Sequence, residues 1–497
     1  MLSYGRCRAA RVSCSAARAV PIPSALASVS RPSSLARIAA AGLTSPSTAT
    51  SSFIFAGRSQ RRWASAWAAA VKDASAVVQP ASTPAEGGAI IADPLKLVGQ
   101  EMQSIRQNIK SLLGSGHPAL DNIAKYYFEA EGKHLRPLIV LLMAQATNGL
   151  SPNYPRLEAQ GEAGTATGVD APISRANVLN DYNPDKPNFS CAFSSTSSAT
   201  SSGAAPTPSS HHIPTSSVSP STAPAILPTQ RRLAEVTEMI HVASLLHDDV
   251  IDSSPERRST ASAPALFGNK LSILAGDFLL GRASVFLARL GSSEVVELMA
   301  TILANLVEGE VMQLKATTAP ETKPTKEGFE RYMQKTYLKT ASLMAKSARS
   351  AVILGGCDAR QGWVEGEMIK EAAYTYGRNL GIAFQLVDDM LDFKPVSAEL
   401  GKPGEGADLR LGLATAPALY AWEEFSELGP LILRKFEDEG DVEKARGFVA
   451  RSQGMQRTAE LAAHHASLAK AALSIFPPSP AKEALEGLTE KVVQRSS

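Results

Sequence analysis

The sequence predicts an all-α protein, with about ten helices bundled around one cavity. Three observations support this fold class. Apolar residues recur at helical spacing from Arg231 almost to the end of the chain. The alternation of apolar and polar residues that is typical of β-strands is absent. Two aspartate-rich motifs of the same form lie in helix-forming stretches, with first residues 140 positions apart.

The expected elements follow in chain order. Residues 93–150 are predicted to be helical, because Ile, Leu, Ala and Tyr recur there with few helix breakers. A long helix is expected from Arg231 to Asp252, where the apolar residues share one face and leave a second face for His241, Ser244, Asp248 and Asp252. Comparable helices are predicted at 270–290, 293–315, 326–354, 365–393, 414–424, 441–451 and 456–474.

Residues 1–72 form a basic leader. They contain nine Arg and one Lys but no Asp or Glu, a charge of +10, so that the rest of the chain carries −8 of the total of +2. An Arg-rich and Ser-rich leader without acidic residues is typical of a mitochondrial transit peptide. The alternative is a disordered basic tail that binds acidic surfaces. No run approaches the 18 apolar residues of a membrane span, and the four cysteines show no zinc spacing.

Residues 151–229 differ sharply in composition from their surroundings. They are crowded with Ser, Thr, Pro, Gly and Asn, and such a segment buries too little apolar surface to offset its ordering entropy. We interpret the segment as a disordered, low-complexity insertion in one catalytic domain, which comprises 93–150 and 230–497. The reason is that 132–137 before it and 241–258 after it contain residues expected in one site, and long surface insertions cost little closure entropy.

The two aspartate motifs are Asp248-Asp249-Val250-Ile251-Asp252 and Asp388-Asp389-Met390-Leu391-Asp392. On a helix the first and last Asp of each motif are i, i+4 neighbours and point the same way. Stacked carboxylates repel one another and are costly to desolvate, so a pair that faces the protein implies bound cations. A single acidic run is more often a solvated helix face, but two copies in the same frame favour a metal site. Mg²⁺ completes its coordination with waters and substrate phosphates, which suggests a diphosphate held between two helices.

The chain resembles the trans-isoprenyl diphosphate synthases, the head-to-tail prenyltransferases, over roughly 95–150 and 230–480. Within that family it is most similar to the mitochondrial polyprenyl (hexaprenyl-type) diphosphate synthases of ubiquinone biosynthesis. The resemblance implies a single-domain helical bundle of the isoprenoid synthase type with a central active-site cavity. The motifs that carry it are Gly132-Lys133-His134-Leu135-Arg136-Pro137, His241 to Asp252, Arg257-Arg258, Gly268-Asn269-Lys270, Ala275-Gly276-Asp277, Lys339-Thr340, Phe384-Gln385 with the second aspartate motif, and Gly401-Lys402-Pro403.

The resemblance also implies roles for individual residues. An allylic diphosphate would lose pyrophosphate with the help of Mg²⁺, three ions with substrate bound, and the carbocation would then react with isopentenyl diphosphate. The catalytic residues would be Asp248, Asp252, Asp388, Lys339 and Arg257. The metal site would comprise Asp248, Asp249, Asp252, Asp388, Asp389 and Asp392, of which Asp249, Asp389 and Asp392 would ligate water or hold positions behind the ligands. The allylic diphosphate would contact Arg257, Lys339, Thr340, Gln385 and Lys402, and isopentenyl diphosphate would contact Lys133, Arg136, His241 and Arg258. We expect a structural role for His247.

Product length is expected to depend on Ala243 and Ser244, which lie about one helical turn deeper than Asp248. Both are small, where short-chain relatives carry bulky aromatics, so we expect a C30–C50 product, with hexaprenyl as the best guess. The sequence departs from many relatives after the Arg pair, where Ser259 to Pro264 replace a glycine and a short turn. The shape of the loop that these residues form is therefore not inferred from the family.

The expected partners are isopentenyl diphosphate and an allylic diphosphate, farnesyl or geranylgeranyl. We expect a mitochondrial homodimer in the matrix or at the matrix face of the inner membrane, without a transmembrane segment or a nucleic-acid partner; a heteromer is the alternative. Two other functions remain open at this point. A terpene cyclase of the same helical class would need no isopentenyl site, and a non-catalytic partner subunit would be expected to have eroded aspartate motifs.

Overall fold

A computed structural model describes residues 97–112, 118–129, 134–162, 169, 224–257, 260–318, 322–359, 362–394 and 406–495. All of them belong to one compact unit, Gly88–Ser497. The leader at 1–72 lies outside the described residues, as do Lys133, Arg258 and Lys402.

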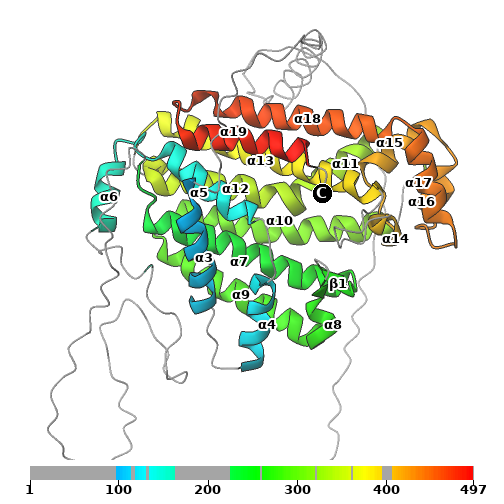
Figure 1. The fold of residues 1–497 in the computed structure, drawn as a ribbon, viewed down its shortest axis with the longest axis horizontal. Coiled ribbons are helices and arrows are strands. Elements are labelled where there is room, and N and C mark those ends of the chain that lie inside the picture. Colours follow the sequence, from blue (N-terminus) through cyan, green and yellow to red (C-terminus); the bar gives the residue numbers. More distant parts are fainter. Residues whose placement is uncertain are drawn as a thin grey trace, which may run out of the picture. The chain divides into compact units, whose positions relative to one another are not determined.

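The described part of the chain is helical apart from one short hairpin (Figure 1). The N-terminal helices are α3 (Gly99–Leu112), α4 (Pro118–Glu129), α5 (Leu135–Thr147) and α6 (Tyr154–Glu162). The central helices are α7 (Pro228–Ile251), α8 (Ala263–Phe267), α9 (Asn269–Arg289), α10 (Ser293–Thr318), α11 (Lys326–Thr336), α12 (Ser342–Val352) and α13 (Glu365–Phe393), with π-helical turns η1 (Tyr337–Ala341) and η2 (Ile353–Cys357) at the two ends of α12. The C-terminal elements are α14 (Ala407–Arg410), α15 (Ala416–Glu424), α16 (Leu428–Leu433), α17 (Asp441–Arg451), α18 (Gly454–Ala472), η4 (Leu473–Ile475) and α19 (Pro480–Val493).

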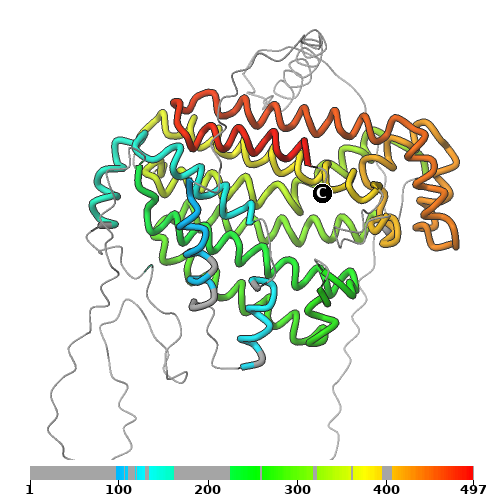
Figure 2. The backbone as a smooth tube through the Cα atoms, viewed as in Figure 1, coloured from blue at the N-terminus to red at the C-terminus, as the bar shows by residue number. Residues whose placement is uncertain are grey.

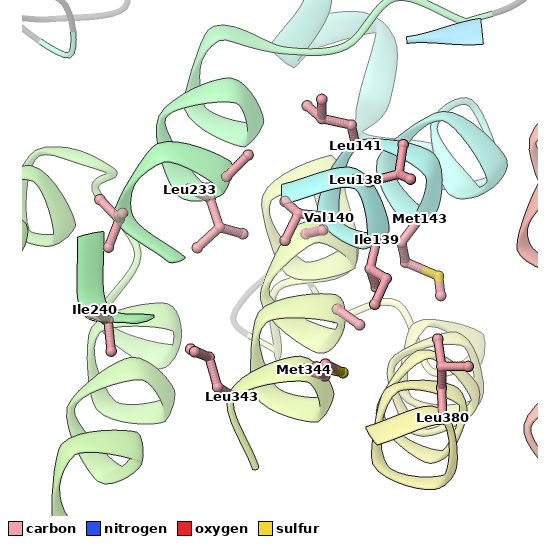
Figure 3. Packing of buried hydrophobic residues seen from close by; sticks show 14 of the residues in the cluster. Leu138, Ile139, Val140, Leu141, Met143, Leu233, Ile240, Leu343, Met344 and Leu380 are labelled. Carbon is pink, nitrogen blue, oxygen red and sulfur yellow. The ribbon is translucent and has the colours of Figure 1, made fainter. Parts of the chain in front are cut away.

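The long helices pack side by side in a series that can be followed in Figures 1 and 2. Helix α13 lies between α18 and α12, α12 also contacts α10, α5 and α7, and α7 packs on α9. The bundle core is formed by apolar side chains of α5, α7, α12 and α13 (Figure 3), among them Ile139, Met143, Leu233, Met344 and Leu380. A second, smaller core around Trp422 joins α15, α16 and α17 at the far end.

Two glycines allow α13 to approach its neighbour closely. A Cβ at Gly377 would lie 2.5 Å from the carbonyl oxygen of Met344, and one at Gly381 would lie 2.6 Å from the Cα of Ala341. Both contacts are shorter than a side chain can tolerate, so only glycine fits. The close approach places η1 directly against α13, about two turns before the second aspartate motif.

The predicted helices are confirmed with small shifts at their ends, and the predicted helix 326–354 is a continuous run of α11, η1 and α12 that extends into η2. One short hairpin accompanies the helices of the all-α fold. Strands β1 (Glu256–Arg257) and β2 (Thr260–Ala261) form an antiparallel hairpin directly after the first aspartate motif. Two-residue strands are too short to show alternation, which explains why the sequence did not indicate them.

The prediction that 151–229 is disordered throughout was also wrong at its N-terminal end. Helix α6 lies within it, and Ser151 donates a 2.8 Å hydrogen bond to the carbonyl of Gly356 in η2. Gly356 has φ of 109°, a conformation that favours glycine. The segment 170–223 lies outside the described residues.

One described helix, α9, is long and apolar enough to cross a membrane by length and composition. A core helix of a soluble bundle meets the same test, and α9 packs against α7, α4 and α8. The finding is therefore weak evidence for a span.

Candidate active site

Both aspartate motifs lie at the C-terminal ends of long helices, α7 and α13. These ends carry the negative pole of the helix dipole, which disfavours carboxylates. Burial, opposed by Lys339 and reinforced by Glu310 and Asp252, raises the pKa of Asp248 to about 6. The pKa of Asp252 is raised for the same main reason. The first motif therefore holds carboxylates that lack sufficient positive charge around them.

The middle aspartate of each motif is held by protein groups instead. Asp249 is fully buried, accepts a 2.6 Å hydrogen bond from Nε of Arg257 and is also bound by the hydroxyl of Tyr127. That hydroxyl accepts a 2.8 Å hydrogen bond from the backbone N–H of Ala263, so Asp249 ties α7 to α4, the hairpin and α8. Arg257, predicted to contact the allylic diphosphate, thus lies at the first motif and pairs with Asp249.

Asp389, the middle residue of the second motif, lies in a chain of hydrogen bonds. The hydroxyl of Thr340 donates to Oε1 of Gln385 at 2.8 Å, and Nε2 of Gln385 donates to Asp389 Oδ1 at 2.8 Å. The hydroxyl of Tyr332 donates to the other oxygen of Asp389. Burial raises the pKa of Asp389 to about 6. The structure therefore brings together Thr340, Gln385 and the second motif, as the resemblance implied.

Lys339 lies on η1, between the two motifs. Its ammonium pairs with Glu310 of α10 and donates a 3.1 Å hydrogen bond to Oε1 of Gln313. It is also the main group that lowers the pKa of Asp248 and Asp252. π-helical turns occur frequently at functional sites. Here the turn directs Lys339 to the first motif while the next residue, Thr340, contacts the side chain of Gln385.

The outer aspartates of the second motif have distinct partners. Oδ1 of Asp388 accepts a 2.7 Å hydrogen bond from Arg495, two residues beyond the end of α19. Asp392 accepts hydrogen bonds from the backbone N–H groups of Ala407 and Asp408, at 2.9 and 3.1 Å. Burial, then the nearby Asp389 and Asp392, raise the pKa of Asp408 to about 8. Asp408 is thus a further carboxylate at this motif that the sequence reasoning missed.

Two residues expected at the isopentenyl site, Arg136 and His241, are in contact. Nη1 of Arg136 lies 3.0 Å from Nε2 of His241. Because a guanidinium can only donate, Nε2 accepts and His241 is in its neutral form with the proton on Nδ1. His134, with φ of 39°, lies 2.9 Å from Glu238 of α7. His247 lies on another face, 3.2 Å from the carbonyl of Ile273 and in a position where a Cβ at Gly276 would clash, in keeping with the structural role expected for it.

The two residues expected to set product length differ in environment. Ser244 is half-buried on the same face of α7 as His241 and Asp248, and its hydroxyl donates a 2.8 Å hydrogen bond to the carbonyl of His241. Ala243 is fully buried in the bundle core. Four residues on a helix advance about 400°, whereas five advance about 500°, so Ser244 lies nearly beneath Asp248 and Ala243 is turned well aside.

The donor set fits divalent cations that bind together with an anion. In the described part of the chain, no three His, Cys, Asp or Glu side chains converge tightly enough to hold a metal ion alone. The carboxylates of Asp248, Asp252 and Asp408 nevertheless have raised pKa values, which a cation would relieve. Hard oxygen ligands of this kind suit Mg²⁺, which needs few protein ligands when phosphates supply the rest.

With this geometry established, the chain can be compared with known proteins. The polyprenyl synthetase family model matches residues 216–449. A "probable hexaprenyl pyrophosphate synthase, mitochondrial" of Neurospora crassa is 51% identical over 440 residues, which cover 87% of this chain and 89% of that protein. The chain belongs to the polyprenyl synthetase family.

Other members of the polyprenyl synthetase family agree. The mitochondrial hexaprenyl pyrophosphate synthase of Saccharomyces cerevisiae is 41% identical, over 87% of this chain and 96% of that protein. A crystal structure of a polyprenyl synthase from Caulobacter crescentus, complexed with calcium and isoprenyl diphosphate, matches with a TM-score of 0.59 and 28% identity, over 83% of this chain and all of that one. These findings confirm the predicted family, the all-α fold, the prenyltransferase class and the mitochondrial location.

Sequence reasoning missed several residues that contact the motifs or lie beside them. They are Tyr127, Glu310, Tyr332, Asp408 and Arg495. Each comes from an element outside the motifs, and single Tyr, Glu or Arg residues on helices carry no spacing signal. For Asp408 the sequence did offer a signal, because this residue follows shortly after the motif Gly401-Lys402-Pro403.

Proposed function

We propose that this protein is a mitochondrial trans-polyprenyl diphosphate synthase that extends an allylic diphosphate with successive isopentenyl diphosphates to a long-chain product for the ubiquinone side chain. The observation that carries the proposal is the pair of aspartate motifs on α7 and α13, on either side of η1, with Lys339 directed to the first and Thr340 to the second. Neither folding nor solubility requires two carboxylate clusters whose negative charge the surrounding protein balances only in part.

Mg²⁺ ions, three with substrate bound, would be held by Asp248, Asp252 and Asp388. When bound they supply a Lewis acid that stabilises the departing pyrophosphate. Asp249, Asp389 and Asp392 would hold positions behind these ligands, where Arg257, Gln385 and the backbone N–H of Ala407 already bind them. Asp408 supplies an additional carboxylate next to Asp389 and Asp392.

The cations of the site bind the allylic diphosphate and neutralise the negative charge of the pyrophosphate as it departs. Lys339 does so from η1, where Glu310 and Gln313 hold its ammonium near the first motif. Arg257 contributes from the hairpin and is oriented by Asp249. Lys402 completes this set. Thr340 of η1 and Gln385 of α13 orient the substrate, and their hydrogen bonds also fix the side chain of Asp389.

Isopentenyl diphosphate binds at a cationic site without metal, formed by Lys133, Arg136, His241 and Arg258. The contact between Arg136 and His241 supports this site, because it links α5 to the face of α7 that carries Asp248. The neutral His241 accepts from Arg136 and so directs the guanidinium. A guanidinium such as that of Arg136 suits a diphosphate, which prefers forked, charge-assisted contacts.

We also propose that two copies of the chain associate through α9 and α10. These helices expose large apolar side chains, including Ile273, Leu274, Val307, Val311 and Leu314, of which Val307 is 64% exposed. Exposed apolar patches of this kind mark interaction surfaces. Light scattering of the purified protein tests the homodimer, and a monomer that becomes active only with a second polypeptide would support the heteromer.

A product assay tests the proposed reaction. The purified protein is incubated with Mg²⁺, farnesyl diphosphate and radiolabelled isopentenyl diphosphate, and the products are resolved by chain length after phosphatase treatment. We expect linear products in the C30–C50 range with hexaprenyl dominant. Turnover of farnesyl diphosphate alone would indicate a cyclase, and no turnover until another subunit is added would indicate a non-catalytic partner.

A further inference from the structure

A pocket of about 610 Å³ lies between the C-terminal end of α10, the whole of α11 and the α15–α16 region. This volume is within the range of small-molecule sites. Its walls are largely apolar, with Phe329 on one side and Leu413, Trp422 and Ile432 on the other. Of the described residues expected to bind the metals or the two diphosphates, none lines it.

The charged residues of the pocket are mostly basic. Lys315, Arg331, Lys335 and Lys435 line it, drawn from three separate segments of the chain. The ammonium of Lys335 lies 5.4 Å from the ring centroid of Tyr332, at the junction of the charged and apolar parts. Among the described lining residues Glu423 is the acidic one, and it is paired with Arg457 at 2.6 Å. Basic side chains therefore outnumber acidic ones among the described lining residues, and the carboxylates of Asp389 and Asp408 also act on Lys335.

The pocket adjoins the catalytic groups without including them. Gln313 lines it and accepts the hydrogen bond from Lys339. Tyr332 lines it too and holds Asp389. A molecule in the pocket would thus contact Gln313 and Tyr332, which are hydrogen-bonded to Lys339 and to Asp389 of the second motif. Such shared residues can couple occupancy of the pocket to catalysis.

We propose that this pocket is a second ligand site, which binds an amphipathic phosphate ester: an anionic head with a short apolar chain. The apolar wall around Trp422 takes the chain, and Lys335, Arg331, Lys315 and Lys435 bind the phosphate. An uncharged apolar ligand would match only the apolar wall, and inorganic phosphate would leave that wall exposed to water. The combination of both features selects the amphipathic anion.

Trp422 provides a local reporter for the test. In the full-length chain, Trp63, Trp67 and Trp363 are replaced by Phe, so that Trp422 is the remaining tryptophan of the four. Farnesyl monophosphate is titrated in EDTA, which prevents metal-dependent binding, with saturating isopentenyl diphosphate to occupy the metal-free diphosphate site. We expect a saturable change in the emission of Trp422.

Charge reversal then identifies the site. Arg331→Glu with Lys435→Glu should weaken binding of farnesyl monophosphate by at least about tenfold. The matched control, Lys326→Glu with Lys444→Glu, makes the same change of charge on α11 and α17 outside the pocket, and should leave the Kd unchanged. If the reversed protein does not fold, Arg331→Gln with Lys435→Gln makes the same test.

Three results would overturn the proposal. The first is an emission of Trp422 that does not respond to farnesyl monophosphate. The second is an equal Kd for the reversed and control proteins, which would place the ligand elsewhere. The third is equal binding of farnesol and farnesyl monophosphate, which would show that the cations do not recognise the head.

Discussion

Replacing Asp248 by Asn should stabilise the metal-free protein and at the same time lower turnover by several orders of magnitude. In the structure this carboxylate lies at the C-terminal end of α7, with Asp252 and Glu310 among the groups that disfavour its charge. Asn keeps the shape of the side chain and removes the charge. The same change removes a metal ligand, so catalysis and stability should respond in opposite directions.

The size of the gain follows from the pKa. Burial raises the pKa of Asp248 from 3.8 to about 6, and one pKa unit corresponds to about 1.4 kcal/mol, so the charged form costs the fold up to about 3 kcal/mol. Because the folded-state pKa is the higher one, this cost is absent below about pH 4, grows as the pH rises and is complete above about pH 7. We therefore expect the variant to match the wild type at pH 4 and to exceed it by about 1–3 kcal/mol at pH 8.

Denaturant unfolding in EDTA at the two pH values measures the free energy of unfolding, and labelled isopentenyl diphosphate measures turnover. Asp249→Asn is the control, since that carboxylate neutralises the buried end of Arg257 and its loss should destabilise the fold by up to about 3 kcal/mol. The reasoning would be refuted if Asp248→Asn lost stability at pH 8, or if it kept near-normal turnover at saturating Mg²⁺.

Three further outcomes are expected. Ser244→Phe should shift products towards about C15–C20 with initial rates retained, because the ring would lie about 6 Å deeper than Asp248 on the same face of α7. Ala243→Phe should instead lower the stability of the fold by about 1–3 kcal/mol through overpacking, which thermal melts measure. Chromatography of dephosphorylated products tests the first outcome, and an unchanged product distribution for Ser244→Phe would show that the channel runs elsewhere. Deletion of 170–222, which spares α6, should leave kcat within a few-fold of the wild type, and an inactive but folded deletion would contradict the insertion hypothesis. Arg495→Ala should lower the Mg²⁺ concentration that gives half-maximal rate, because the guanidinium competes with metal for a carboxylate of the second motif; an unchanged Mg²⁺ dependence would argue against that competition.

Much of the fold was predictable because it consists of long amphipathic helices. Apolar residues at helical spacing located α7, α9, α10 and α13 to within a few residues. Helix α19 was missed, although it buries Leu485 and Leu488 and begins with the start signals Ser479 and Pro480. The π-helical turn η1 was also not predictable, since one extra residue in a turn leaves the sequence pattern of a helix nearly unchanged.

The site was predictable to the extent that its residues belong to local motifs. The paired aspartates, Lys339 and Thr340 occupy one region, as expected. The pairing of Arg495 with Asp388 was not, because it depends on a contact between segments 107 residues apart. The pairing of Arg257 with Asp249 is local, but it depends on the hairpin turn that the sequence did not indicate. Periodicity specifies which face of a helix is polar, but it does not specify which group that face meets.

The central claim is that the two aspartate motifs bind divalent cations jointly with an allylic diphosphate. Electron paramagnetic resonance of Mn²⁺ in the presence of farnesyl thiodiphosphate, which resists ionisation, counts the bound ions directly. We predict several tightly bound ions in the wild type, and fewer in both Asp248→Asn and Asp388→Asn, with the thiodiphosphate required in each case. Binding of the same number of ions when either motif is disabled, or without the thiodiphosphate, would contradict the account.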